Sequence, residues 1–300
     1  MSGGARRQTA GPLRDRTVVV TGAARGIGAA LARDLSRRGA RLALVGHEKT
    51  ELEALAAVLT TPALACEADV TDPAAMEHAA GLIRTRLGPP SVVVANAGVA
   101  EGGAFAASDP ERWRRVVDVN LTGSAVTARV FLPDLLETRG YYLQVASLAS
   151  IGAAPMMSAY CASKAGAEAF AHCLRAEVAH RGVAVGIGYL TWIDTDMIRD
   201  ADRYPVMREL RAGMPPPARR VYPVDRAAAR LGSAVENRST AVYLPRWLRL
   251  AQAGRAALPS MVTRATRRRL SRLESGTPLL PTGPLGTGGA ADRAAPPSGN

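Results

Sequence analysis

Thr17-Val-Val-Val-Thr-Gly-Ala-Ala-Arg-Gly-Ile-Gly28 is the stretch that decides the fold. It begins with a β-branched run typical of a buried strand and continues into a glycine-rich turn, after which an alanine- and leucine-rich helical pattern runs to Arg38. A strand, a glycine turn and a helix in this order favour a loop that binds the phosphates of a dinucleotide. Gly22 permits the tight turn, and Gly26 and Gly28 let the backbone approach a pyrophosphate at the helix N-terminus. Because the spacing is G-x-x-x-G-x-G rather than G-x-G-x-x-G, a glycine loop without a ligand is the alternative.

The alternation of strand and helix patterns continues to Leu244. We expect further strands at Arg41–Val45, Ala63–Glu67, Ser91–Ala95, Tyr141–Ala146, Val183–Tyr189 and Ala241–Leu244. We expect helices at Thr50–Leu59, Ala74–Leu87, Pro110–Val117, Leu121–Glu137 and Tyr160–His180, and another that begins at Asp225. This order predicts an α/β fold, a doubly wound parallel sheet covered by helices on both faces, in a single domain from residue 14 to residue 245.

Tyr160-Cys-Ala-Ser-Lys164 opens one of the predicted helices and carries a candidate acid/base pair. The four-residue spacing puts the phenol of Tyr160 and the ammonium of Lys164 on one helical face. A nearby positive charge lowers the pKa of a tyrosine, ordinarily about 10, toward the range in which proton transfer to an alcohol or ketone works. Of the 38 lysines and arginines, only Lys49 and Lys164 are lysines, which favours a site that needs a compact ammonium. An ordinary surface helix is the alternative.

The residues after the second predicted strand bear on the choice of dinucleotide. Gly46 and His47 stand where dinucleotide-binding folds place the acid that holds the adenosine ribose, and Arg25 lies in the glycine loop. A lost negative charge and an added positive one suit a 2′-phosphate, so the sequence favours NADP(H). Glu48 lies one position further along the chain and keeps NAD(H) as the alternative.

Polar or small residues follow the other predicted strands. Asp69 and Val70 stand where an adenine amino group would be read, with simple turn chemistry as the alternative. Asn96-Ala-Gly98 would let a cofactor lie close to a strand end. Asn120 interrupts a helical pattern, which indicates a site or a kink, and Ser147 ends the strand that precedes Tyr160.

Taken together, these motifs resemble the short-chain dehydrogenase/reductase family over about residues 14–244. The matching positions, all in order, are Thr21, Gly22, Gly26, Ile27, Gly28, Asp69, Asn96, Ala97, Gly98, Asn120, Ser147, Tyr160 and Lys164. The resemblance implies a Rossmann-like fold and a cofactor site completed by Arg25, Gly46, His47 and Val70. Two positions depart from the family pattern: Leu190-Thr191 replaces its Pro-Gly, and Ala95 replaces the first residue of its Asn-Asn-Ala-Gly.

The resemblance also implies a role for each catalytic residue. Tyr160 would be the general acid/base, and Ser147 would orient and polarise the substrate oxygen. Lys164 would hold the nicotinamide ribose and lower the pKa of Tyr160. Asn120 would support a water that relays protons, and Thr195 would meet the nicotinamide end of the cofactor. The expected enzyme interconverts a carbonyl and a secondary alcohol, and it assembles as a homodimer or homotetramer.

A catalytically silent, nucleotide-binding regulator is the alternative function. The intact catalytic set argues against it, because a protein that only binds a nucleotide needs none of those four side chains. The segment Met197–Arg220 contributes three methionines, at positions 197, 207 and 214, to the region that covers the substrate in this family. It favours a large apolar substrate, although methionines also serve simply as packing residues.

The net charge of +12 is carried by the C-terminal third of the chain. Within it, residues 246–274 mix Trp, Leu and Arg, and we interpret them as a basic amphipathic extension. Such an extension either makes a peripheral contact with an anionic membrane or packs on its own domain or on a partner subunit. Nucleic-acid binding is not expected, because the arginines lack interleaved aromatic residues and a known motif.

The rest of the composition points to a cytoplasmic enzyme. Residues 1–13 lack the apolar stretch of a secretory signal and predict a flexible arm, whereas residues 275–300 are Gly/Pro-rich and predict a disordered tail. No uninterrupted apolar run approaches the roughly 18–20 residues of a membrane span. Cys66, Cys161 and Cys173 are odd in number and lack metal-type spacing, so we expect reduced thiols and no metal site.

Overall fold

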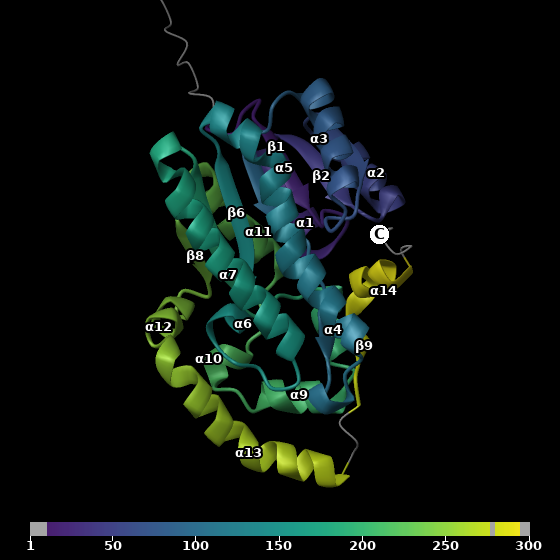
Figure 1. Cartoon of the computed structure of the whole chain (residues 1–300), viewed down its shortest axis with the longest axis vertical. Helices are drawn as coiled ribbons and strands as arrows, with labels where there is room; N and C mark the ends of the chain where they lie inside the picture. The colour runs from purple at the N-terminus through teal and green to yellow at the C-terminus, as the bar shows by residue number, and fades with distance from the viewer. Residues whose placement is uncertain (1–10, 277–279, 295–300) are drawn as a thin grey trace, which may run out of the picture.

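A seven-stranded parallel sheet in the order β3-β2-β1-β4-β6-β7-β8 forms the centre of the protein (Figure 1). The computed structural model describes residues 11–276 and 280–294. The strands of the sheet are β1 (Thr17–Thr21), β2 (Arg41–Gly46), β3 (Ala63–Glu67), β4 (Val92–Ala95), β6 (Tyr141–Ser147), β7 (Ala184–Leu190) and β8 (Ala241–Leu244). The doubly wound α/β fold expected from the sequence is confirmed, and every expected strand is present to within one residue at each end.

Helices cover both faces of the sheet. One face carries α1 (Gly26–Arg37), α2 (Lys49–Ala57) and α11 (Val224–Glu236). The other carries α3 (Pro73–Leu87), α5 (Gly123–Thr138) and α7 (Ser158–Val178). Shorter elements that connect them are β5 (Glu101–Gly102), η1 (Phe105–Ala107), α4 (Pro110–Val117), η2 (Asp118–Thr122), α6 (Leu148–Ile151), η3 (Ala179–Arg181), α8 (Asp196–Ala201), α9 (Pro205–Ala212) and α10 (Pro216–Arg219).

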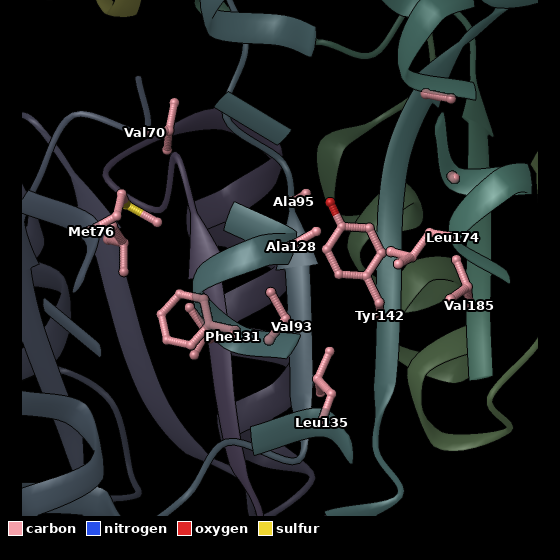
Figure 2. Packing of buried hydrophobic residues seen from close by; sticks show 14 of the residues in the cluster. Val70, Met76, Val93, Ala95, Ala128, Phe131, Leu135, Tyr142, Leu174 and Val185 are labelled. Atoms are coloured by element: carbon pink, nitrogen blue, oxygen red, sulfur yellow. The ribbon is translucent and has the colours of Figure 1, made fainter. Parts of the chain in front are cut away.

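The strands are apolar on both sides because each side faces a layer of helices. Along β1, Val19 enters the core beneath α3, α5 and α7, whereas Val18 and Val20 enter the core beneath α1, α2 and α11. Figure 2 shows Phe131 of α5 and Tyr142 of β6 in the first of these cores; both side chains are fully buried. The two cores fix the sheet and therefore the position of every loop at its edges.

The strand order reverses between β2 and β4, the two neighbours of β1. The loops after β1 and β4 consequently leave the sheet toward opposite faces and open a crevice at its carboxyl edge. This is the position at which open α/β sheets bind their ligands. The predicted glycine loop and Asn96-Ala-Gly98 both lie there.

The chain continues past β8 into an extension that packs on the domain. It consists of α12 (Leu248–Ala253), η4 (Arg255–Ala257), α13 (Leu258–Gly276), β9 (Gly283–Pro284) and α14 (Gly286–Ala294). Leu248 of α12 is fully buried, and Trp247 and Leu258 pack against the core beneath α7. Arg255 of η4 reaches Glu168 of α7, with an N···O distance of 3.0 Å. Packing on the parent domain therefore accounts for the first part of the extension.

The prediction of a disordered tail from residue 275 onward is wrong for residues 280–294. Residues 283 and 284 form β9, which pairs with β5, and residues 286–294 form α14, which contacts α8. The remaining parts of that prediction, residues 277–279 and 295–300, lie outside the described residues, as do residues 1–10 of the predicted flexible arm. Leu13, at the end of that arm, is buried. In the described part of the chain, no helix is long and apolar enough to cross a membrane.

Candidate active site

A cleft with a volume of about 220 Å³ lies at the carboxyl edge of the sheet. The residues of the predicted site that line it are Gly22, Arg25, Gly26, Ile27, Gly46, His47, Val70, Asn96, Ala97, Gly98, Ser147, Tyr160, Lys164 and Thr195. The other four, Thr21, Gly28, Asp69 and Asn120, do not line the cleft. They lie directly behind it and contact residues that do line it. The structure therefore brings the whole predicted set to one place.

The glycine loop is packed so closely that two of its glycines cannot be replaced without a clash. Gly22 has a φ of +62°, and a Cβ atom there would lie 2.8 Å from the Cα atom of Ala97. A Cβ atom on Gly28 would lie 2.1 Å from the carbonyl oxygen of Gly22. The glycines thus first serve the packing of the loop against itself and against the end of β4.

Thr21 and Asn96 tie the glycine loop to the end of β4. The Asn96 side chain donates hydrogen bonds to the carbonyl oxygens of Thr21 and Gly22, at 3.0 and 3.1 Å. In return, the Thr21 hydroxyl accepts hydrogen bonds from the backbone N–H groups of Asn96 and Ala97, both at 3.1 Å. These reciprocal bonds hold the two loops on opposite sides of the crevice in a fixed relation.

The N-terminus of α1 has the features of an anion site. The helix begins at Gly26, its N-cap residue Arg25 makes no side-chain capping bond, and its first turn contains no acidic residue. The first N–H groups of such a helix end point outward and carry a partial positive charge. This donor set fits the pyrophosphate of a dinucleotide.

Ser147 and Tyr160 meet at the other end of the cleft. The Ser147 hydroxyl caps the short helix α6 by accepting a hydrogen bond from the Ala149 N–H at 3.1 Å, and it lies near enough to the phenol of Tyr160 to affect the pKa of that group. Burial raises the pKa of Tyr160, and the nearby Ser147 hydroxyl opposes this effect only in part. The phenol is therefore held in its protonated form beside a serine hydroxyl.

Lys164 lies one helical turn after Tyr160, with its ammonium 5.8 Å from the centre of the phenol ring. It donates a hydrogen bond to the Val145 carbonyl oxygen at 3.3 Å, and burial lowers its own pKa to about 8. The expected lowering of the Tyr160 pKa by Lys164 is not found in this arrangement. The reason is that burial penalises the charged form of each group.

Asn120 is completely buried at the π-helical turn η2, where the sequence indicated a site or a kink. Its side chain accepts a hydrogen bond from the Val99 N–H and donates to the Val99 carbonyl, at 2.8 and 2.9 Å. It also donates to the Ser163 hydroxyl on α7 at 2.9 Å. The π turn thus aims Asn120 at the loop after β4, and its side chain fixes that loop against α7.

The adenosine end of the cleft contains two groups of charges. In the first, Arg25 pairs with Glu48 and, at 3.6 Å, with Glu51. Arg25 is therefore held by carboxylates rather than left free for a phosphate. Glu48, which kept NAD(H) as the alternative, is the closer of the two partners.

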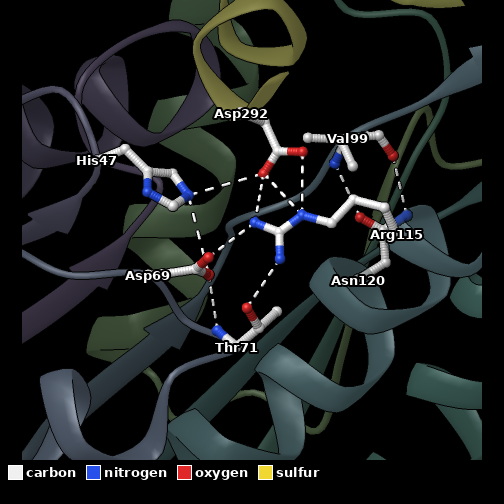
Figure 3. Close-up of polar contacts among 7 residues, drawn as sticks. All are labelled: His47, Asp69, Thr71, Val99, Arg115, Asn120 and Asp292. Carbon is white, nitrogen blue, oxygen red and sulfur yellow. Dashed lines mark hydrogen bonds and ion pairs between the residues drawn. The ribbon is translucent and has the colours of Figure 1, made fainter. Parts of the chain in front are cut away.

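The second group is centred on Arg115 of α4 (Figure 3). Arg115 donates hydrogen bonds to Asp69 at 2.8 Å, to Thr71 at 2.9 Å and to Asp292 of α14 at 2.7 Å. Burial pushes the pKa of Asp69 upward, but the hydrogen bonds from Thr71 and Arg115 outweigh it and hold the pKa below its usual range. The His47 imidazole lies 3.8 Å from Asp69 and 3.7 Å from Asp292.

Leu285 and Asp292 line the cleft and were not foreseen from the sequence, and neither was Arg115, which does not line the cleft but binds Asp292; Thr191 also lines the cleft. Thr191 stands at a departure from the family pattern, and its buried hydroxyl has no hydrogen-bond partner among the described residues. Asp292 is the one acidic residue in the stretch from 275 to 300, which is the only signal that the sequence offered for it. Arg115 and Leu285 have no local signal.

Residues 16–204 match the family model for short chain dehydrogenases. This match covers more than half of the chain. The chain belongs to the short-chain dehydrogenase family. Membership places it in a class of NAD(P)-dependent oxidoreductases that interconvert CH–OH and C=O groups.

Two relatives of this short-chain dehydrogenase illustrate the likeness. It is 32% identical over 215 residues to the dehydrogenase/reductase SDR family member 7B of Bos taurus. The aligned region covers 67% of this chain and 66% of the bovine protein. It is 31% identical over 191 residues to an uncharacterized oxidoreductase of Staphylococcus epidermidis. The aligned region covers 63% of this chain and 83% of the relative.

Solved structures agree with the fold. The crystal structure of gox2181 has a TM-score of 0.70 at 24% identity, covering 77% of this chain and 95% of that one. An alcohol dehydrogenase from the archaeon Thermococcus sibiricus, complexed with 5-hydroxy-NADP, has a TM-score of 0.65 at 27% identity, covering 74% of this chain and 90% of that one. The residues after 204 lie beyond the match to the family model.

Proposed function

We propose that this short-chain dehydrogenase uses NADP(H) to interconvert a carbonyl and a secondary alcohol on an apolar substrate, with Tyr160 as the general acid/base. The observation that carries the proposal is that Ser147, Tyr160 and Lys164 line the same cleft as the glycine loop. A proton donor and a dinucleotide loop that share one cleft are what a hydride transfer to a carbonyl requires.

The cleft offers groups suited to the pyrophosphate, the nicotinamide ribose and the nicotinamide of a dinucleotide. The N-terminus of α1 would hold the pyrophosphate, and Lys164 would hold the nicotinamide ribose. The Thr191 hydroxyl, which is buried and without a partner among the described residues, would meet the nicotinamide end together with Thr195. The bound nicotinamide supplies or accepts the hydride.

Tyr160 would move the proton. In the direction of reduction, the protonated phenol donates to the substrate oxygen while Ser147 donates a hydrogen bond to the same oxygen and orients it. Burial raises the pKa of Tyr160 and keeps the phenol protonated in the ligand-free cleft, whereas efficient proton transfer near neutral pH requires that pKa to fall when the cofactor binds. For the reverse direction, the phosphates of the dinucleotide would favour the charged form of Lys164, and that charge would favour the phenolate.

Preference for NADP(H) is supported by the absence of an acid at Gly46 and His47 and by Arg25 beside them. The archaeal neighbour complexed with 5-hydroxy-NADP is a further argument. The ion pair between Arg25 and Glu48 works against it, so the 2′-phosphate would have to draw Arg25 away from that carboxylate. NAD(H) is therefore the alternative cofactor.

The expectation of an apolar substrate is supported by the surroundings of Tyr160. Its neighbours on the substrate side include Met157, Met197 and Tyr204, which pack around the buried Ala201. Met207 of α9 is buried beside Gly102. Apolar side chains of this kind favour a hydrocarbon-rich carbonyl or alcohol over a charged one.

The test is the kinetics of Tyr160→Phe against a panel of apolar carbonyls with NADPH. We expect kcat to fall by about 10²–10⁴-fold, the usual contribution of a general acid, while the Kd for NADPH stays within about threefold. Tyr243→Phe is the matched control, because this ring stacks on Tyr189 at 4.9 Å and takes no part in the cleft. Activity of Tyr160→Phe within tenfold of the parent would contradict the assignment. Tight NADPH binding without turnover in the parent would favour the silent regulator instead.

Membrane contact, which the sequence allowed for residues 246–274, is proposed for α13 alone, since α12 packs on the domain. On α13 the arginines at 264, 267, 268 and 272 are exposed, and Met261 is 60% exposed. The inward residues of the same helix include Leu258 and Val262. Its outward face is thus basic and nearly free of large apolar residues, which favours electrostatic attachment over insertion.

A further inference from the structure

The C-terminal segment, residues 281–292, crosses the candidate active site from its substrate side to its adenosine end. It is fixed at the start by backbone pairing: Thr282 N–H donates to the Gly102 carbonyl at 2.7 Å, and Leu285 N–H donates to the Ala100 carbonyl at 2.8 Å. Figure 1 shows β9 and α14 beside α4, and four residues of α14 line the cleft. The segment is therefore part of the folded domain, not an appendage.

Leu285 fills the apolar pocket beside the catalytic tyrosine. Its side chain is 1% exposed and belongs to a small cluster with Ala100 and Ala201, against which Tyr160 and Met197 pack. These are the surroundings in which the proposed function places the apolar substrate. The leucine and a hydrocarbon substrate would thus require the same space.

Asp292 occupies the opposite end of the cleft. Its side chain is 8% exposed, and its carboxylate receives hydrogen bonds from Arg115 at 2.7 and 3.1 Å (Figure 3). It also lies 3.7 Å from His47, the residue that follows β2. An anion held by Arg115 and His47 stands where the adenosine part of a dinucleotide, with its 2′-phosphate, would bring its own oxygens.

Between these two ends the segment is fitted closely to α8. Gly286 has a φ of +74°, its N–H donates to Asp200 at 2.9 Å, and a Cβ atom there would lie 2.7 Å from the backbone nitrogen of Met197. The Thr287 hydroxyl donates to Asp196 at 2.9 Å. α8 begins directly after Thr195, which the proposed function places at the nicotinamide. The segment therefore lies against the part of the cleft in which the nicotinamide would bind.

The space that the segment leaves is small. Leu285, Gly286, Gly288, Gly289 and Asp292 all line the cleft, whose volume is about 220 Å³. Pockets for drug-sized ligands have roughly 300–1,000 Å³, and a dinucleotide together with a substrate is larger than such a ligand. The cleft with the segment in place is too small for both.

We propose that residues 281–292 are an autoinhibitory segment that competes with the dinucleotide through Asp292 and with the apolar substrate through Leu285. Binding of the cofactor then requires the segment to leave the cleft. The proposal rests on the proposed function, because it takes the dinucleotide to bind in this cleft. If the segment occupies the cleft in about 90% of molecules, the apparent Kd for the cofactor is raised about tenfold.

The first test compares two glycine substitutions in the full-length chain. Gly286→Ala should release the segment, because the new Cβ meets backbone atoms and the positive φ disfavours alanine. Gly81→Ala on α3 is the control, since this residue does not line the cleft and no atom lies within 4 Å of its Cβ. NADPH binding is followed by the fluorescence of the nicotinamide, with thermal melting in parallel. We expect Gly286→Ala to lower the Kd for NADPH by about tenfold and Gly81→Ala to leave it unchanged.

The second test separates the charge of Asp292 from its shape. Asp292→Asn keeps the volume and frees Arg115 and His47 from a carboxylate, so it should lower the Kd for NADPH more than the Kd for NADH. The exposed Asp225→Asn on α11 is the control for a general change of net charge. An equal Kd for NADPH in Asp292→Asn and the parent would overturn the part of the proposal that concerns the adenosine end.

Amide hydrogen exchange of residues 282–292 in the parent protein decides between a competitor and a lid. The proposal expects saturating NADPH to speed exchange in these residues. Slower exchange with NADPH, or weaker NADPH binding by a folded Gly286→Ala, would show that the segment closes over the cofactor and would overturn the proposal. If parent and variants all fold but none binds NADPH or NADH, the proposed function itself is wrong, which is a different result from parent and Gly286→Ala binding equally well.

Discussion

Glu48→Gln is the substitution that most directly tests how the cleft selects its cofactor. Arg25 donates hydrogen bonds to Glu48, through its Nε atom at 2.7 Å and also through its terminal nitrogen. The Glu48 side chain is 15% exposed and that of Arg25 is 31% exposed, so water screens the pair only in part. A 2′-phosphate that reaches Arg25 must compete with this carboxylate and is repelled by it.

The size of the effect follows from the charges. Two unit charges about 6 Å apart interact by roughly 3 kcal/mol at an effective dielectric constant of about 20. Partial exposure reduces such interactions to about 1 kcal/mol or less per pair. A phosphate with nearly two negative charges should therefore gain about 1–2 kcal/mol when Glu48 becomes neutral, which corresponds to roughly a five- to thirtyfold tighter Kd. NADH has a neutral hydroxyl at this position and should change by less than about twofold.

The assay is the ratio of kcat/KM values for NADPH and NADH at low ionic strength, measured for the parent and for Glu48→Gln. Glu51→Gln is the matched control, because Glu51 is 48% exposed and lies 3.6 Å from Arg25. Its ratio should change by less than threefold. A ratio that is unchanged in Glu48→Gln, or that moves toward NADH, would refute the view that Arg25 binds the 2′-phosphate.

Three further predictions concern other parts of the chain. Thr191→Val removes a cleft hydroxyl without a partner among the described residues and should weaken NADPH binding about three- to tenfold. Thr191→Ser should bind NADPH as the parent does. Equal Kd values for the parent and the two variants would show that the hydroxyl does not contact the cofactor. Gly28→Ala places a Cβ atom 2.1 Å from a backbone oxygen, so urea denaturation should show a free energy of unfolding lower by about 1–3 kcal/mol. Gly81→Ala, with no atom within 4 Å, should show no loss, and similar midpoints for the two would contradict the packing argument. Finally, the full-length protein should sediment with anionic vesicles and detach from them as salt is added. Replacement of the four exposed arginines of α13 by glutamine should abolish this sedimentation. Equal sedimentation with neutral vesicles would rule out the electrostatic mechanism.

The strands of the sheet and the placement of the candidate site residues at one edge of it could be predicted because both depend on short-range patterns. The β-branched runs at Thr17–Thr21 and Val92–Ala95 are apolar on both faces, which is the pattern of strands buried between two helical layers. Motif residues such as Asn96 and Ser147 stand at strand ends, and parallel strands deliver all of their carboxyl ends to one edge. Asn120 was marked by its poor fit to a helix, and the chain forms a π turn there.

The charge network at the adenosine end was beyond sequence reasoning. Arg115 sits in an ordinary-looking basic helix, and its partners Asp69 and Asp292 are 46 and 177 positions away. Nothing in the local pattern states which acids an arginine will meet. Likewise, the pKa of Tyr160 was expected to fall through Lys164, but it rises, since the degree of burial is a property of the folded chain and outweighs a charge that is itself disfavoured.

The C-terminal segment shows why composition alone misjudges such a stretch. Its glycines and prolines give it no periodicity, so it cannot fold by itself; its order comes from the backbone bonds to β5, the burial of Leu285 and the ion pair of Asp292. The segment is held by a two-residue pairing, one buried leucine, hydrogen bonds to α8 and one ion pair, but it has no place in the central sheet, and peripheral elements of this kind open at a lower free energy than the core. A segment that must leave the cleft when the cofactor arrives needs this low stability. The weak propensity of these residues for regular secondary structure made the segment look disordered in the sequence. The same weak propensity would let a dinucleotide displace the segment from the cleft.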